Sequence, residues 1–182
     1  MQEHMLSTPV YQNVHDLQIL HGKTLFLVQS SQPTAVQHIQ QKMRDVDFEN
    51  FFIFQDSAIW AEQIQAVVFQ CLNQAQAGWR AVIHGEEYFI WLVDHALRQV
   101  GLLKDEIARV LIEGKRNVYC VHCFHMQNSD SEDFCQCENC GVDLLIRSHF
   151  SERLGAYMGV CANAEHLGGP YQKIKALEVS HV

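Results

Sequence analysis

Two pairs of cysteines constrain this chain more than any other feature of its sequence. Cys120 and Cys123 form one C-x-x-C pair, Cys137 and Cys140 form a second, and 13 residues separate the pairs. Each pair suits a tight turn whose two thiolates converge on one ion, and Gly141 adds conformational freedom after the second pair. The spacing is that of a zinc ribbon. The sequence therefore predicts a tetrahedral tetrathiolate metal site formed by these four residues.

The residues around the two pairs leave the ligand set partly open. Cys135 is a second candidate for the corner assigned to Cys137, which we favour because it repeats the C-x-x-C spacing. His122 and His125 could replace a thiolate, but four cysteines already satisfy a structural site. We therefore expect both histidines to lie in loops and not to bind the ion. Four thiolates leave no open coordination position, so the ion either stabilises the fold or passes electrons. Zinc suits this shell, and iron would form a rubredoxin-like centre in it.

Composition and charge narrow the class of protein. The 182 residues are 48% hydrophobic, enough for a core, and five of the seven cysteines lie within residues 120–140, which favours metal over disulfides. The net charge of -8, without a Lys/Arg-rich run, argues against nucleic-acid binding. Residues 1–10 lack the basic and apolar parts of a signal peptide, and no apolar run approaches about 18 residues. We expect a cytoplasmic protein without a membrane span.

Upstream of the cysteines, apolar residues alternate between strand-like and helix-like spacing. Four short apolar runs predict strands, the first two of them buried: residues 24–28, 51–54, 81–83 and 107–112. Three stretches with helical spacing predict helices: residues 33–46, a segment within 57–77, and 89–100. Strands and helices in this order predict an α/β fold, with a small parallel sheet joined by right-handed crossovers and flanked by helices.

The alternating pattern stops after Gly114-Lys115-Arg116, which divides the chain into four predicted parts. They are an N-terminal arm (1–22), an α/β domain (23–116), the four-cysteine metal ribbon (117–148), and a C-terminal helix and tail (149–182). The helix is predicted within residues 150–160 because Leu154 and Met158 have i, i+4 spacing.

Residues 81–91, continued by residues 100–107, resemble the last β-α-β unit of ferredoxin-reductase nicotinamide domains. That unit normally follows a Cys-Gly-Pro-type turn, whereas here His84 takes the cysteine position and Glu86 the proline position. Serines and a proline (residues 30–33) replace a glycine-rich phosphate loop after the first strand, which argues against NAD(P) binding. His84 could be catalytic because ligands gather at the carboxyl ends of parallel strands, but we interpret it as a satisfied turn histidine.

Three motifs together resemble the DmmA-like small subunit of dimethylamine monooxygenase, over about residues 23 to 160. They are Gly78-Trp79-Arg80 with the turn at 85–87, Tyr-Cys-Val-His-Cys at 119–123, and Leu-Ile-Arg-Ser-His-Phe-Ser-Glu-Arg-Leu-Gly-Ala-Tyr-Met-Gly-Val at 145–160. The last motif is the most specific, because folding needs do not explain so long a segment and generic zinc ribbons do not carry it.

The resemblance implies a hetero-oligomeric enzyme. In this family the chain works beside a haem-dependent oxygenase subunit and a flavin and iron–sulfur reductase subunit, which demethylate dimethylamine or a similar amine. The chain would support electron transfer and assembly through its metal site, without holding the haem or being catalytic alone. Two alternatives are a zinc-ribbon protein-interaction module and a stand-alone nicotinamide-dependent reductase.

The segment after the ribbon needs a partner to explain it, so we expect a docking surface there. Its predicted residues are Arg147, His149, Phe150, Arg153, Tyr157 and Met158. The alternative is that Phe150, Leu154 and Met158 only pack the predicted helix onto the ribbon.

Overall fold

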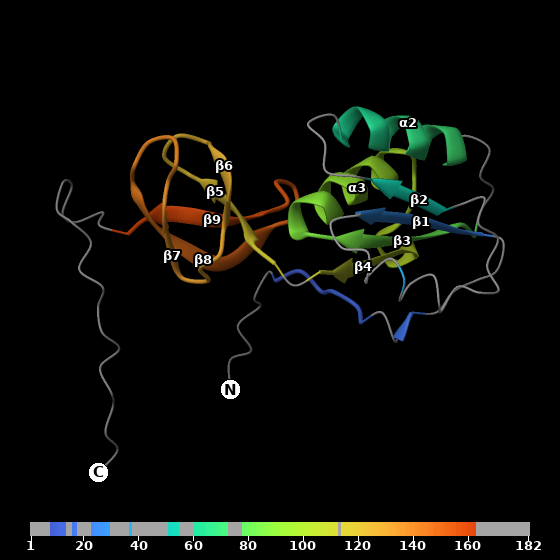
Figure 1. Cartoon of the computed structure of the whole chain (residues 1–182), viewed down its shortest axis with the longest axis horizontal. Coiled ribbons are helices and arrows are strands. Elements are labelled where there is room, and N and C mark those ends of the chain that lie inside the picture. Colours follow the sequence, from blue (N-terminus) through green and yellow to red (C-terminus); the bar gives the residue numbers. More distant parts are fainter. Residues whose placement is uncertain are drawn as a thin grey trace, which may run out of the picture.

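The computed structural model describes residues 8–13, 16–17, 23–29, 37, 51–54, 60–72, 78–112 and 114–162. These residues form two sheets that lie side by side, one parallel with helices packed on it and one built around the cysteines (Figure 1). The predicted order of an α/β unit followed by a cysteine-bearing unit is therefore confirmed. Among the helices of the described segments, none is long and apolar enough to cross a bilayer.

The parallel sheet has four strands in the spatial order β2-β1-β3-β4. Its strands are β1 (Thr24–Gln29), β2 (Phe51–Phe54), β3 (Arg80–Gly85) and β4 (Ile107–Leu111). The central strand β1 is buried along its whole length, as its continuous apolar run predicts. The strand predicted at residues 51–54 exists, but its predicted burial was wrong. It lies at the sheet edge, where Ile53 is 46% exposed and only Phe54 is buried.

Two helices, α2 (Trp60–Leu72) and α3 (Glu87–Gln99), cover the same face of this sheet (Figure 1). Ile64 and Val68 of α2 and Leu97 of α3 are buried in one cluster with the strand residues of that face. The other face has a smaller hydrophobic cluster around Phe26, and Leu17 of the arm packs against it. The helix predicted at residues 33–46 lies outside the described residues apart from position 37, and so does the tail from position 163.

The second sheet has five strands in the order β6-β5-β9-β8-β7. They are β5 (Arg116–Cys120), β6 (Met126–Ser129), β7 (Phe134–Gln136), β8 (Asp143–Ser151) and β9 (Ala156–Cys161). The pair β5–β9 is parallel, and the other neighbouring pairs are antiparallel. The two strands that follow the cysteine segment in sequence, β8 and β9, therefore lie between β7 and β5 and complete the sheet that carries the cysteines.

The C-terminal helix predicted within residues 150–160 is wrong. This segment is the end of β8, a turn and β9. Gly155 makes the turn with φ of 63°, a left-handed conformation that glycine adopts without steric cost. Gly159 lets β9 pack closely, because a Cβ there would lie 2.9 Å from Val118 Cγ1. One i, i+4 pair of apolar residues was too little to indicate a helix across two glycines.

Aromatic packing joins the two sheets through α3. The ring centroid of Trp91 lies 5.0 Å from that of Phe150, which lies 4.9 Å from that of Tyr157. All three side chains are buried in the core cluster that spans both sheets. A Cβ at Gly155 would lie 2.6 Å from Trp91 Cβ, so the β8–β9 turn contacts the helix closely.

Candidate metal centre

The four predicted cysteines come from two tight turns at one end of the second sheet. Cys120 ends β5 and Cys123 precedes β6, while Cys137 follows β7 and Cys140 precedes β8. Their Sγ atoms all lie within 4.8 Å of one another, with 3.9 Å between Cys120 and Cys140 and 3.5 Å between Cys123 and Cys137. A tetrahedral ion with metal–sulfur bonds of about 2.3 Å places its thiolates about 3.8 Å apart. The spacing of this thiol quartet therefore fits a single zinc or iron ion.

The first knuckle (residues 120–125) and the second knuckle (residues 137–142) have the same backbone hydrogen bonds. The N–H of Phe124 donates to Cys120 O over 2.8 Å, and the N–H of Gly141 donates to Cys137 O over 2.9 Å. In each knuckle the N–H of the first cysteine also donates, over 2.9 Å, to the carbonyl oxygen five residues later. Phe124 and Gly141 both have a left-handed backbone, with φ of 65° and 70°. The two turns thus present their thiols in equivalent ways.

The thiols of the quartet differ in environment. Cys120 and Cys137 are buried, whereas Cys123 and Cys140 are half-buried. A hydrogen bond with the Asn139 side chain is the main reason why the pKa of Cys123 falls to about 6. At Cys140 the N–H of Val142 lowers the pKa, but burial and the neighbouring thiols outweigh it and raise the pKa to about 12. A metal ion bound here would displace protons from the thiols that are still protonated, such as Cys140, since metal ligands are thiolates.

The other candidate ligands lie outside the quartet. Cys135 is half-buried in β7, where its sulfur is 3.7 Å from Gln127 Nε2 and burial raises its pKa. His122 is exposed and His125 half-buried. Among the described residues, the side chains that converge closely enough to hold an ion are the four cysteines favoured from the spacing.

Gln127 is a residue of the site that sequence reasoning missed. Its side chain is buried on β6 and reaches across to the second knuckle. Its Nε2 donates to Gln136 O over 2.8 Å, and its Oε1 accepts the N–H of Glu138 over 2.9 Å. These two groups flank Cys137, so the amide fixes the backbone that carries one ligand. A glutamine in a short polar strand gave no signal of this role.

The predicted docking residues divide into two groups. Arg147, His149 and Arg153 are exposed and Met158 is half-buried, but Phe150 and Tyr157 are only 2% and 8% exposed. Their burial argues against a part for these two aromatic residues in the predicted docking surface. On strands, rather than on the predicted helix, they point into the junction with α3.

Glu87 links the α/β domain to the cysteine ribbon. Its Oε1 accepts the hydroxyl of Tyr11 over 2.7 Å, and its Oε2 accepts the N–H of Asn117 over 3.0 Å. Asn117 in turn donates from Nδ2 to Gly155 O over 2.7 Å, and Trp91 Nε1 donates to the Tyr11 hydroxyl over 3.2 Å. Burial raises the pKa of Glu87. The arm, α3 and the ribbon are thus held by one hydrogen-bonded group.

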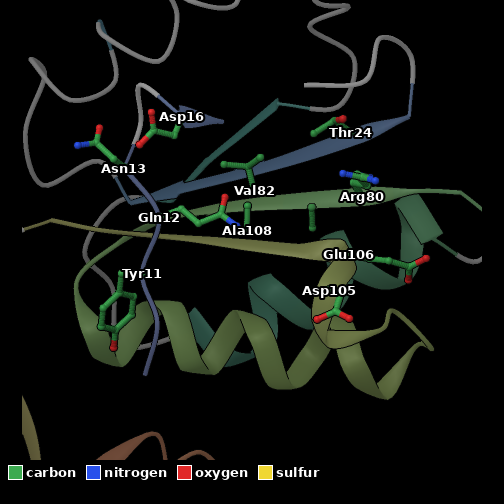
Figure 2. Close-up of a pocket in the computed structure, with 11 residues that line it drawn as sticks. Tyr11, Gln12, Asn13, Asp16, Thr24, Arg80, Val82, Asp105, Glu106 and Ala108 are labelled. Atoms are coloured by element: carbon green, nitrogen blue, oxygen red, sulfur yellow. The ribbon is translucent and has the colours of Figure 1, made fainter. Parts of the chain in front are cut away.

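A separate polar cavity of about 400 Å³ lies between the arm and the parallel sheet, and its strand residues come from the starts of β1, β3 and β4. Figure 2 shows Tyr11 and Asn13 of the arm on one side and Asp105 on another, with Thr24 and Arg80 at the starts of β1 and β3. Open α/β sheets bind ligands at the opposite, carboxyl ends of their strands. The cavity therefore does not coincide with the usual ligand position of such a sheet.

Fold and site together define a class of protein, in which a parallel α/β domain packs against a ribbon with four converging thiols. Residues 117–160 match the family described as "Dimethylamine monooxygenase subunit DmmA-like, C-terminal domain". The heme-dependent oxidative N-demethylase delta subunit of Ectopseudomonas mendocina (strain ymp) is 43% identical over 113 residues, which cover 62% of this chain and 63% of that protein. The predicted resemblance to the DmmA-like family is confirmed, and the match spans less than two thirds of that relative's length.

Proposed function

We propose that this chain is a non-haem subunit of a multicomponent, haem-dependent amine monooxygenase, and that it brings a tetrathiolate metal ion to that assembly. The observation that supports this most is the coincidence of two findings on one segment. The stretch that matches the DmmA-like C-terminal domain is the one whose four thiols converge. Zinc at this site would fix the two knuckles, and iron would supply a one-electron centre.

The relatives suggest the finer assignments. The description of the family names dimethylamine monooxygenase, and the name of the relative refers to heme-dependent oxidative N-demethylation. We therefore propose dimethylamine or a similar amine as the substrate of the assembly, in the cytoplasm. The proposed partners are a haem-dependent oxygenase subunit and a flavin and iron–sulfur reductase subunit, while this chain supports assembly and electron delivery. The exposed Arg147, His149 and Arg153 remain candidates for contacts with those partners.

For the α/β domain (residues 23–116) we propose a scaffold role, in a fold derived from ferredoxin-reductase nicotinamide domains. Gln29 Oε1 accepts the N–H of Glu86 over 2.7 Å at the start of α3, where a nucleotide phosphate would need free donors. A Cβ at Gly85 would lie 2.4 Å from the Phe89 ring and 2.8 Å from Gln29 Oε1, so the chain's own side chains fill this space. Both observations argue against NAD(P) binding and hence against a stand-alone reductase.

The first test is to purify the protein without added metal and measure its elemental content and visible spectrum. One iron per chain with red thiolate-to-metal absorption would support a relay, and one colourless zinc would support a structural ion. Metal well below one per chain, together with no gain in stability on adding zinc or iron, would refute the metal site. Mixing with the purified oxygenase and reductase subunits in size-exclusion chromatography then separates a subunit from an interaction module that serves another system.

A further inference from the structure

The two knuckles share one backbone but not one residue type at its most restricted position. Gly141 adopts its left-handed conformation without steric cost, because it has no Cβ. Phe124 holds the equivalent conformation with a bulky side chain, which is unfavourable for such a residue. Glycine at position 124 would satisfy the same turn, so the first knuckle is more strained than metal binding requires.

The side chain of Phe124 contributes little to the fold that could offset this strain. It is 71% exposed, the second-highest value among the exposed large hydrophobic residues in the described part of the chain. Its ring stacks on that of half-buried Tyr119, with centroids 6.2 Å apart and planes inclined by 28°. Strain of this kind concentrates at functional sites, where the strained residue serves another purpose. An exposed aromatic ring beside a metal ligand is suited to an external contact.

The surroundings of Phe124 indicate the charge of that contact. Between Arg116 and Arg147 the sequence has no Lys or Arg, and Glu138 is exposed on the second knuckle. A divalent ion bound by four thiolates has net negative charge, and Cys123 and Cys140 are only half-buried. The knuckle end therefore combines one apolar anchor with negative charge.

From these observations we infer that Phe124 anchors a docking surface on another subunit of the proposed assembly, namely an apolar pocket rimmed by Arg or Lys side chains. Buried aromatic anchors dominate the affinity of protein interfaces, and complementary charge around them guides association. This inference rests on the proposed function and adds the part of the ribbon that meets the partner. It assigns Phe124 no role in metal coordination.

The test uses the full chain with Phe124→Gly, beside the unsubstituted protein. Because glycine relaxes the turn, the variant should keep its metal content and melt at the same or a higher temperature. Its affinity for the purified oxygenase or reductase subunit, measured by biolayer interferometry, should fall by at least about tenfold. Phe124→Asn is a second variant, since asparagine tolerates the left-handed region better than most residues. The control is Phe69→Ala on α2, another exposed phenylalanine, which should bind normally.

Two further measurements separate the outcomes. Glu138→Gln should weaken binding about two- to fivefold and reduce its dependence on salt, because an exposed charge contributes modestly. Undiminished binding by Phe124→Gly would overturn the docking role while leaving the proposed function intact. Failure of the unsubstituted chain to bind either subunit would instead refute the proposed function, and the docking role with it. Sedimentation that shows Phe124-dependent dimers of this chain would assign the surface to a second copy and overturn the partner inferred here.

Discussion

Replacing Gln127 by alanine should weaken metal binding although no ligand is removed. The substitution deletes the hydrogen bonds to Gln136 O and from the N–H of Glu138, on either side of Cys137. Each unpaired group costs about 1–3 kcal/mol, and the lower part of this range applies because Gln136 and Glu138 are exposed and water can reach them. The sum is about 2–3 kcal/mol, which corresponds to about 30- to 150-fold weaker affinity if the metal-free knuckle lacks this order.

The assay loads the protein with Co²⁺ and follows loss of thiolate-to-cobalt absorption during competition with a chelator of known affinity. Gln136→Ala is the matched control, because it removes the same kind of side chain from β7, where the amide is exposed and donates to Gly141 O over 3.2 Å. The control should stay within about threefold of the unsubstituted protein, as surface changes usually do. Gln127→Glu should fall between them, since a carboxylate accepts from Glu138 but cannot donate to Gln136. Equal affinities for Gln127→Ala and Gln136→Ala would refute the positioning role.

Three further predictions concern the core and the sheet. Phe150→Ala should lower the free energy of unfolding by about 3–5 kcal/mol. Melts of the Co²⁺-loaded protein, followed by fluorescence of the three tryptophans of the α/β domain and by thiolate-to-cobalt absorption of the ribbon, should shift together. A shift of only one signal would contradict the shared core. Burial lowers the pKa of His84, so the stability that the neutral imidazole contributes is present above about pH 6.5 and is lost as pH falls through the lowered pKa. His84→Leu should therefore reduce the drop in melting temperature between about pH 7.5 and 5.5. An unchanged drop would exclude this histidine as its source. Asp94→Asn should lower the free energy of unfolding, measured by urea denaturation, by about 3–5 kcal/mol, because buried Arg109 loses its counter-ion. Adding Arg109→Met to the same chain should restore most of this stability. No loss in the single variant, or no recovery in the double variant, would show that the ion pair does not have this role.

The parts of this protein that could be predicted from its sequence depend on local spacing. The thiol quartet follows from two C-x-x-C turns, whose geometry is set within a few residues. The central parallel strands follow from apolar runs such as residues 24–28, because a strand buried on both faces needs apolar side chains on each. Both α2 and α3 were expected from helical spacing, and the structure differs from those predictions by only a few residues at their ends.

The parts that could not be predicted depend on contacts distant in sequence. Phe150 and Tyr157 are buried because β8 and β9 pack against α3, and no local pattern encodes that packing. The edge position of β2 depends on the order of strands in the sheet, which periodicity does not reveal. His84 lies within β3 rather than in a turn, and among the described residues its Nδ1 has no hydrogen-bond partner, so it is not the satisfied turn histidine expected. Gln127 binds backbone groups, and because every residue has such groups, the sequence does not show which of them a side chain will contact.

The connection between the two sheets is short and is reinforced on several sides. Only residues 112–115 separate β4 from β5, and Lys104 of the α/β domain forms an ion pair with Glu152 in the β8–β9 turn. Glu87 adds its hydrogen bond to Asn117. A carrier on a flexible tether can visit two partners in turn, but this ribbon has no such freedom to swing. A partner protein that exchanges electrons with the ribbon, or binds to it, therefore meets the two knuckles at a fixed distance from the parallel sheet.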